Sequence, residues 1–580
     1  MIGKQSGQRG LFEADHLYLD YVGRDTFYGF LASQRGKLFR DEDFAELYCP
    51  DNGRRSVPPS LLATVLLLQT YDRVSDAEAK RRADLDISWK VALGIGIEER
   101  LFAKSTLQLF RAHLVLHDKI RAVFEKSLVF ARQTGYMRKR RIKVALDTSN
   151  ILGKGAVKDT YNLLADGIVK LAGALASGAG EKPNAWASEQ GLLRYFGSSL
   201  KGEANIDWDD ETARRAFLNE VVADADRLLE MARHAVESSD DKMERERLTE
   251  AAELLAQLLL QDIERRADGA AIKEGVSRDR MVSVHDPEMR HGHKSKSKRF
   301  DGHKVALAVD TESQLITAVA VLPGNAPDNE RALELVEESE ENAQVEVEET
   351  IGDCAYGDGL TRQEFIDAGR KLIARVPKRP NQSHFPKEDF TIDLEAMTCQ
   401  CPAGQVTKKL VRRGRRKDRR GQARALYAFQ FDEAVCKSCP LRASCVKGKS
   451  GKGRTVSLHP QEALLQEARA FQRSEAYAPY RALRQVAEHR VARLMQLGAR
   501  KARYFGRNKT LYQSLIAATV ANLTLVATKT GLMRGPGGAK SFVSFHFSRI
   551  LGAIRAFMTC FSTVFNLGDT FKPAENPVFG

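Results

Sequence analysis

The chain has 580 residues, of which 43% are hydrophobic and 29% charged. It is therefore too long for one ordinary core and too apolar for a disordered protein, and we expect two or three folded domains. A formal net charge of +14 suggests a polyanionic partner, nucleic acid before an anionic membrane. The first residues lack the apolar core of a secretory signal, and the apolar stretches 515–526 and 550–565 are too short or too interrupted to span a bilayer. We expect the protein to lie in the cytoplasm, which in a bacterium contains the nucleoid.

Short apolar helices with basic surfaces dominate residues 1–135. A proline start signal at 58–60 introduces one helix, and the Ser75-x-x-Glu78 spacing of a capping box introduces a second. Ser105 or Thr106 is the expected cap of a third. Short helices with basic faces and tight turns suggest a helix-turn-helix-like DNA-binding unit. The alternative is a helical packing domain with no part in DNA readout.

Asp147 is the first candidate for a catalytic residue. Ile142, Val144 and Leu146 alternate as in a β-strand, and Thr-Ser-Asn at 148–150 lets the chain turn, which places Asp147 at the strand exit. A carboxylate at the end of a buried strand is held rigidly at the rim of the sheet, where ligands of open α/β sheets bind. Asp147 becomes a credible catalytic candidate only together with two acids that occur later in the chain.

Residues 155–280 form a predicted helical insertion, because Ala, Leu, Glu and Arg recur at helical spacing through 220–237 and 240–266. Its charge runs are expected to be solvated faces rather than catalytic parts. The polar loop 283–299 that follows contains three His among several Lys and Arg. Since those cations repel a metal ion, we interpret the loop as a phosphate contact.

The β pattern returns after this loop. Residues 303–309 and 315–322 predict a hairpin with Asp310 as a turn former, and Asp328 or Asn329 is the expected cap of the next helix. A strand over 348–353 ends on Asp353, and a helix over 361–368 leads to a last strand over 372–376. This order of elements is that of a ribonuclease H-like α/β core with a mixed five-stranded sheet. The first and fourth strands are neighbours in that topology, so Asp147 and Asp353 are expected side by side.

Residues 378–460 combine cysteines with a basic run. The run, 408–424, holds ten Lys or Arg and one Asp, so it is expected to follow a phosphate backbone or stay mobile. The cysteines that frame it are Cys399, Cys401, Cys436, Cys439 and Cys445. Four thiolates in two clusters have the ligand types of a structural Zn²⁺ site. The alternative is that reduced cysteines fill a small β-subdomain.

Residues 461–533 are predicted to be helical and to carry the third acid, Glu488. Arg484 and Glu488 share one helical face, one turn apart. A basic segment with Arg500, Lys501 and Arg503 follows, and 515–526 is expected to be a core helix. The tail from 534 to 580 shows no informative pattern.

Three carboxylates from two strands and a helix repel one another unless a cation shares them. Hard oxygen ligands of this kind suit Mg²⁺ or Mn²⁺. Two such ions activate a water or a DNA 3′-hydroxyl and stabilise the departing oxyanion in an in-line displacement. Arg484 is suited to hold a phosphate or to orient Glu488. The alternative is that Glu488 is an exposed helix acid paired with Arg484.

With these residues the chain resembles the DDE transposases of bacterial insertion sequences. The resemblance rests on Val-Ala-Leu-Asp-Thr-Ser at 144–149, on Ile-Gly-Asp-Cys-Ala-Tyr-Gly at 351–357, and on Arg484-x-x-x-Glu488 with Tyr480 upstream. It covers roughly residues 11–530.

The sequence departs from the family pattern near the third acid. Relatives often have Tyr-x-x-Arg-x-x-x-Glu, whereas Tyr480 stands one residue too far from Arg484. Met495 occupies a position where relatives have a lysine, and Arg493 or Lys501 is the expected substitute.

The resemblance implies Asp147, Asp353 and Glu488 as catalytic metal ligands for Mg²⁺ or Mn²⁺. It also implies binding of terminal inverted repeats, strand cleavage and strand transfer into target DNA by at least a homodimer on paired ends. The residues expected to contact DNA are Arg484, Lys294, Lys296, Lys298, Arg299, Arg412, Arg413, Arg415, Arg416, Arg500, Lys501 and Arg503.

Two other classes of protein fit parts of the same sequence. A ribonuclease H-like nuclease or resolvase uses the same acids without strand joining, and a domesticated DNA-binding protein no longer cuts. Inverted repeats flanking the coding sequence favour the transposase. The expected domains are 1–135 (helical, DNA-binding), 136–377 (core with insertion 155–280), 378–460 (Cys-containing basic insertion), 461–533 (closing helices) and 534–580 (tail).

Overall fold

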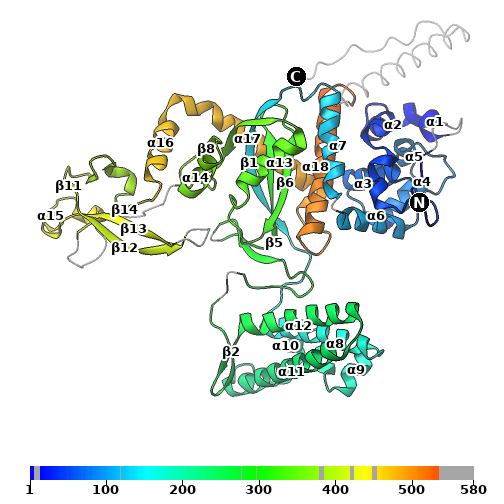
Figure 1. Ribbon diagram of the computed structural model, residues 1–580, viewed down its shortest axis with the longest axis horizontal. Helices are drawn as coiled ribbons and strands as arrows, with labels where there is room; N and C mark the ends of the chain where they lie inside the picture. Colours follow the sequence, from blue (N-terminus) through cyan, green and yellow to red (C-terminus); the bar gives the residue numbers. More distant parts are fainter. Residues whose placement is uncertain are drawn as a thin grey trace, which may run out of the picture.

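The computed structural model describes residues 1–5, 13–117, 119–275, 277, 279–295, 297–377, 384–417, 423–446 and 453–533. Lys296, the tip of the basic run at 418–422 and the predicted tail lie outside these residues, as does the side chain of Arg416. Figure 1 shows a central sheet with a helical region on one side, a small β region on the other and a helical lobe below.

The N-terminal region is helical, as predicted. Its helices are α1 (Ala14–Val22), α2 (Phe27–Leu38), the 3-10 helix η1 (Asp41–Leu47), α3 (Pro59–Tyr71), α4 (Asp76–Leu85), α5 (Ile87–Leu93), α6 (Lys104–Leu116) and α7 (Ile120–Gln133). The predicted cap at Ser75 is confirmed, because its side chain accepts a hydrogen bond from the Glu78 amide. The predicted cap at Ser105 or Thr106 is wrong: α6 begins one residue earlier and its N-cap, Ala103, offers no side-chain bond.

The described residues of the core form a six-stranded mixed sheet rather than the five strands predicted. Its strands are β1 (Arg141–Leu152), β4 (Arg290–His293), β5 (Arg299–Asp310), β6 (Ile316–Pro323), β7 (Glu346–Gly352) and β8 (Leu372–Ala374). β5 and β6 form the predicted hairpin, and β1 is antiparallel to β5 and parallel to β7. β7 is in turn parallel to β8. The additional strand, β4, comes from the polar loop, which pairs with the start of β5 instead of staying irregular.

β1 is longer than the sequence suggests, and the prediction that the chain turns directly after Asp147 is wrong. The strand continues to Leu152 because its edge against β5 stays paired from Val144 to Leu152. Its other edge pairs with β7 only from Arg141 to Ala145. The polar residues after Asp147 are therefore held in the strand by β5, a long-range effect that the local turn-forming pattern does not reveal.

Helices enclose this sheet. α13 (Ala332–Ala343) and α18 (Arg507–Lys529) pack against β6, α18 also contacts α7, and α17 (Ala478–Leu494) lies over β1 and β5. α14 (Gly359–Asp367) links β7 to β8. The predicted cap of α13 is wrong, because the helix begins after Arg331. Asp328 instead pairs with Lys304, and Asn329 donates to the side chain of Thr361.

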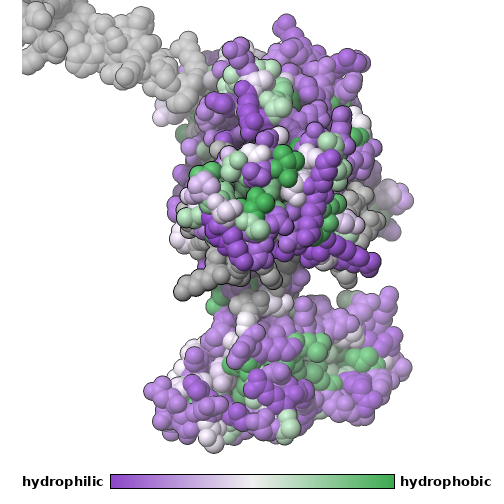
Figure 2. Space-filling view, turned by 90° about the vertical axis from the view of Figure 1, so that its left-hand side faces the viewer, coloured by the Kyte–Doolittle hydropathy of each residue, from purple (hydrophilic) through white to green (hydrophobic). Residues whose placement is uncertain are grey.

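The insertion between β1 and β4 has its own hydrophobic core. Its elements are α8 (Thr160–Gly178), α9 (Pro183–Glu189), α10 (Leu200–Glu203), α11 (Glu211–Ser238), α12 (Lys242–Asp262), β2 (Ile263–Arg266) and β3 (Gly269–Ile272). The helix predicted to run to 266 ends at Asp262, where the β2–β3 hairpin begins. Figure 2 shows the insertion as a separate lobe with a mostly hydrophilic surface in this view. Residues 160–272 hold 22 acidic and 13 basic side chains, so the basic excess of the chain lies elsewhere.

The cysteine region consists of two small sheets. One contains β9 (Thr391–Asp393), β10 (Thr398–Gln400) and β11 (Val406–Thr407), and the other β12 (Leu410–Lys417), β13 (Ala423–Gln430) and β14 (Thr455–Leu458). The short helix α15 (Glu433–Lys437) follows β13, and α16 (Glu462–Arg473) leads back to the core. A π-helical turn, Met495–Ala499, joins α17 to the region before α18.

α18 is the predicted core helix, and the prediction is confirmed. It meets the length and composition of a membrane-spanning helix, but 89% of its apolar window is buried inside the protein. α8 and α9 meet the same criterion only when they are joined across a bend of 100°. Helices buried in the core of a folded protein have the same length and apolar composition as these candidates.

Asn522 fastens α18 to the edge of the sheet. Its side chain is fully buried. The amide oxygen accepts from the Ile316 amide at 2.9 Å, and the amide nitrogen donates to the Ile316 carbonyl at 2.9 Å and to Ser127 Oγ at 3.3 Å. One side chain thus pairs both backbone groups of Ile316, at the start of the edge strand β6, and reaches α7.

We predict that Asn522→Leu lowers the free energy of unfolding of the core by about 2–5 kcal/mol, because it leaves two buried backbone groups of Ile316 without partners. The measurement is urea denaturation followed by the fluorescence of Trp89, which lies in this core. Trp186 and Trp208 belong to the insertion and are replaced by Phe in the background used. Asn508→Leu, on the exposed first turn of the same helix, is the matched control and should change little; equal losses of stability in the two variants would contradict the clamp.

Candidate active site

The two strand acids lie where the parallel pairing of β1 and β7 ends. The last paired residues are Ala145 and Ile351. Asp147 lies two residues further along β1, and Asp353 follows directly after β7. The prediction that the first and fourth strands of the core are neighbours is confirmed. The carboxylates consequently emerge at the same edge, as is usual for ligand sites of open α/β sheets.

Asp147 lies in an environment that disfavours its negative charge. The pKa of Asp147 is raised to about 6, first by burial and then by the nearby carboxylates of Asp353 and Glu488; the Thr148 amide and the Arg484 guanidinium oppose this rise. The Thr148 amide donates to Asp147 Oδ1 at 2.9 Å, and the Ala355 amide donates to Asp353 Oδ1 at 2.8 Å. The three predicted acids are therefore within electrostatic reach of one another.

Glu488 comes from α17, which packs over β1. Its Oε1 lies 2.6 Å from Nη1 of Arg484, one turn earlier on the helix. The Glu488 side chain is 47% exposed. The ion pair between Glu488 and Arg484, which was the alternative to a catalytic role, is therefore present. The charges of Glu488 and Arg484 nevertheless both act on Asp147.

The chemistry of these acids fits a hard divalent cation. Their oxygens are the ligands that Mg²⁺ and Mn²⁺ prefer, and the raised pKa of Asp147 marks negative charge without a compensating cation. Among the described residues, no three His, Cys, Asp or Glu side chains are gathered closely enough to hold a metal ion. Glu488 is held by Arg484 instead of turning to the aspartates.

Glu349 on β7 is a residue that the sequence did not single out. Lys143 and Lys371 lie 2.7 and 2.5 Å from its carboxylate, and Tyr480 donates to it at 2.9 Å. Burial raises the pKa of Glu349, but these hydrogen bonds outweigh burial and lower the pKa to about 2. Because Tyr480 begins the helix that carries Glu488, this contact sets the position of α17 on the sheet.

A second residue that was missed is Tyr356, which follows Asp353 closely in the chain. Its side chain is fully buried, and its hydroxyl has no hydrogen-bond partner among the described residues. Burial, and then the charges of Asp147, Asp328 and Asp353, raise the pKa of Tyr356 well above its usual value. It belongs to the hydrophobic core next to the acids, whose charges act on it. Tyr356 belongs to the Ile-Gly-Asp-Cys-Ala-Tyr-Gly motif at 351–357, but that motif assigned it no role of its own.

Two of the predicted basic segments meet at the far end of β1. Leu152 pairs with Gly302 at the start of β5, just after the β4–β5 turn, on which Lys294, Lys298 and Arg299 are exposed. On the other side, the Leu152 amide donates to the Arg500 carbonyl at 2.9 Å, and the Ala502 amide donates to the Leu152 carbonyl at 2.8 Å.

The exposed Arg500 and Lys501 therefore adjoin the same end of β1. Arg503 is directed instead toward the N-terminal helices, where its guanidinium lies 3.8 Å from Asp76.

The predicted basic run lies away from this edge. Arg412, Arg413 and Arg415 are exposed on β12, in the small β region that Figure 1 shows at the opposite end of the molecule from α1–α6. The cysteines belong to the same small β region. Cys401, Cys436, Cys439 and Cys445 line one pocket, whereas Cys399 is in the small core.

Comparison with known proteins gives two family matches. Residues 400–527 match a family described as a transposase DDE domain, and residues 22–113 match a family described as a transposase domain (DUF772). The first match includes Glu488 and the four cysteines that line the pocket, and the second includes most of the N-terminal helices. No curated protein matches the chain. The two matches indicate a DDE-type transposase of the insertion-sequence kind.

We predict that Glu349→Gln destabilises the core at neutral pH by about 2–3 kcal/mol, from a pKa difference of roughly two units between folded and unfolded states. The folded pKa is depressed, so the stabilisation is present above the unfolded pKa of about 4.3 and disappears as the pH falls toward 2. Urea denaturation of both proteins between pH 3 and pH 7, read from Trp89, measures it.

The matched control is Glu348→Gln, which removes the exposed neighbouring acid. It should leave stability almost unchanged at every pH. A difference between wild type and Glu349→Gln that does not shrink on acidification would contradict the ion-pair origin of the effect.

Proposed function

We propose that this chain binds the terminal inverted repeats of an insertion sequence and catalyses DNA strand cleavage and strand transfer with Asp147, Asp353 and Glu488. The observation that carries the proposal is the convergence of their charges at the edge where β1 and β7 part. A DDE-type family match over the segment containing Glu488 supports it.

A ribonuclease H-like core is part of the same proposal. In chain order the five main strands are β1, β5, β6, β7 and β8, and across the sheet they run β6-β5-β1-β7-β8. The pairs β6–β5 and β5–β1 are antiparallel, whereas the pairs β1–β7 and β7–β8 are parallel. This arrangement supports the fold expected from the order of sequence elements, with the domain limits 1–135, 136–377, 378–460 and 461–533.

In the proposed reaction, Asp147 and Asp353 hold divalent cations from adjacent strands and Glu488 contributes from α17. When bound, Mg²⁺ or Mn²⁺ activates a water or a 3′-hydroxyl and stabilises the oxyanion that leaves. The half-buried position of Asp147 limits the access of bulk water to its carboxylate. Glu488 would have to release Arg484 to help hold a cation, and the freed Arg484 guanidinium would then be available for a DNA phosphate.

Double-stranded DNA is the proposed partner. The β4–β5 turn and the segment 500–501 bring exposed cations to the end of β1, five residues beyond Asp147. Phosphate contacts there would position the duplex across the acids without reading its sequence. End recognition is assigned to the N-terminal helices, and handling two ends together requires at least a homodimer.

We predict that Asp147→Asn, Asp353→Asn and Glu488→Gln each reduce cleavage by at least about a thousandfold, because each removes several kcal/mol of metal-mediated transition-state stabilisation. The assay uses DNA carrying the inverted repeats that flank the coding sequence, with Mg²⁺, and scores nicking and joining separately. End binding in gel shifts should persist.

Asp367→Asn, an exposed acid at the end of α14, is the control and should cleave normally. A catalytic-site variant that retains near wild-type cleavage is not a ligand, and the triad would be wrong. Cleavage without any joining would identify a nuclease or resolvase instead.

We further predict that Arg412→Ala, Arg413→Ala and Arg415→Ala combined weaken DNA binding with little sequence dependence. The slope of log affinity against log salt should fall by about 0.9 for each phosphate that the variant no longer neutralises. Lys182→Gln, Lys242→Gln and Arg247→Gln combined remove the same charge from the acidic insertion and should leave the slope unchanged. An unchanged slope in the β12 variant would exclude this strand from the DNA interface.

A further inference from the structure

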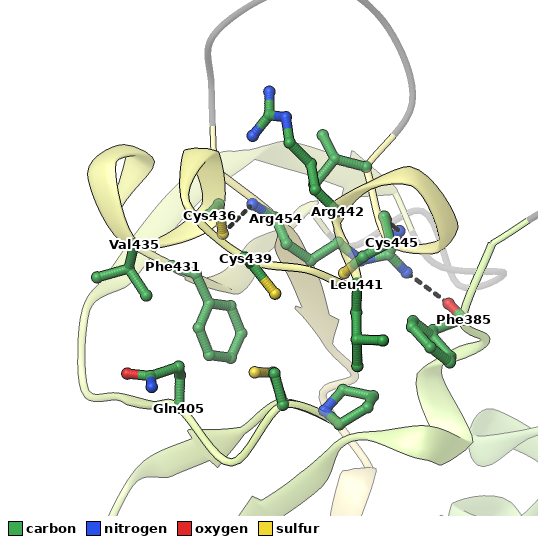
Figure 3. Close-up of a pocket in the computed structure, with 14 residues that line it drawn as sticks. Phe385, Gln405, Phe431, Val435, Cys436, Cys439, Leu441, Arg442, Cys445 and Arg454 are labelled. Atoms are coloured by element: carbon green, nitrogen blue, oxygen red, sulfur yellow. Dashed lines mark hydrogen bonds between the residues drawn. The ribbon is translucent and has the colours of Figure 1, made fainter.

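We propose that Cys401, Cys436, Cys439 and Cys445 form a structural Zn²⁺ site that holds the base of the β12–β13 arm. The four thiols come from separate parts of the cysteine region and line a single pocket. Figure 3 shows the labelled Cys436, Cys439 and Cys445 around this pocket. Four thiolates from two sequence clusters are the ligand set of structural Zn²⁺ sites.

The elements that carry these thiols place them around one pocket. Cys401 lies in the turn between β10 and β11, where its amide donates to the Gln405 carbonyl at 2.8 Å. Cys436 belongs to α15, and Cys439 and Cys445 follow it. Cys401, Cys436 and Cys439 are all near enough to act electrostatically on Cys445.

The structure also selects four ligands from five cysteines. Cys399 has no exposed surface and packs among Phe390, Ile392 and Phe429 in the small core. It does not line the pocket, whereas Cys401, two residues later, does. Cys399 is therefore a residue of the small core, whereas Cys401 faces the pocket. The sequence alone does not distinguish these two roles.

Arg454 contributes an amide and a guanidinium to the pocket, and both are suited to support a metal-bound thiolate. Its amide donates to Cys436 Sγ at 3.5 Å, and its guanidinium donates to the Cys445 carbonyl at 2.6 Å and the Phe385 carbonyl at 2.8 Å. Amide hydrogen bonds to sulfur and a fixed surrounding shell are what orient ligands around a metal. A cation beside the thiols also offsets part of the charge of four thiolates.

The sulfur atoms surround the pocket without forming a coordination shell, since no three ligands among the described residues are gathered tightly enough to hold a metal. Closing the shell requires rotation of cysteine side chains into the pocket that they line. Neutral thiols pack as small apolar groups and have no reason to converge. On binding, four Zn–S bonds form and up to four thiol protons pass to solvent.

The size of the local core explains why a metal is needed. Among the described residues, the buried apolar cluster of this region is small: Phe390, Ile392, Cys399, Phe429, Phe431 and Val456. They must hold two three-stranded sheets and a strand with exposed Arg412, Arg413 and Arg415. Small units with so little core are commonly stabilised by a structural metal.

The test is the metal content of the full-length protein purified without added chelator, measured by mass spectrometry. We expect about one zinc per chain. The metal should remain in Cys49→Ser, which removes an exposed cysteine outside the region, and in Cys399→Ala. It should be absent from Cys401→Ser and from Cys439→Ser.

Cobalt substitution keeps the proposal testable if a serine variant fails to fold. Wild-type protein loaded with Co²⁺ should show the thiolate charge-transfer and visible bands of a tetrahedral sulfur site. Cys401→His should retain the metal with a shifted spectrum, since imidazole is also a tetrahedral Zn²⁺ ligand.

Folded protein that contains no zinc and takes up neither Zn²⁺ nor Co²⁺ would overturn the site. Zinc retained in Cys401→Ser but absent from Cys399→Ala would overturn the choice of ligands. The result does not depend on the catalytic proposal, because Asp147→Asn should retain its zinc.

Discussion

The unequal pairing of the two edges of β1 is the constraint on which the candidate site depends. One edge stays hydrogen-bonded to β5 as far as Leu152, while the other leaves β7 after Ala145. Asp147 is therefore fixed by a continuous ladder on one side and open on the other. Asp353 enters that opening directly from the end of β7. A rigid strand beside a gap lets a buried carboxylate be held in place without being covered.

The third acid depends on contacts outside the site itself. α17 is fixed at its start by Tyr480 on Glu349 and continues through the π-helical turn into the segment that pairs with Leu152. α18 then joins β6 and α7 through Asn522. Glu488 is thus positioned by a helix anchored at both ends. The N-terminal helices and the sheet share one hydrophobic core, so the helical region and the candidate active site are mechanically connected.

The sequence predicted the elements whose signals are local. The β5–β6 hairpin, the Ser75 cap and the neighbouring of β1 and β7 follow from alternation, capping chemistry and element order. The length of β1 did not, because pairing with β5 overrides the turn-forming residues after Asp147. Glu349 looked like any surface acid, since its three partners come from distant segments. Cys399 and Cys401 are indistinguishable in sequence, and only burial separates them. Local patterns therefore locate elements and acids, but not the long-range contacts that orient them.

The insertion also governs when the sheet can form during synthesis. β1 emerges long before β5 or β7, and the intervening helices can close their own core while β1 waits without a partner. Glu488 follows Asp147 by 341 positions. At a synthesis rate of roughly 5–20 residues per second, about 20–70 s separate the first acid from the third. A nascent or prematurely released chain thus carries Asp147 and Asp353 before it carries Glu488, so the three acids of the candidate site can meet only after α17 has been synthesised.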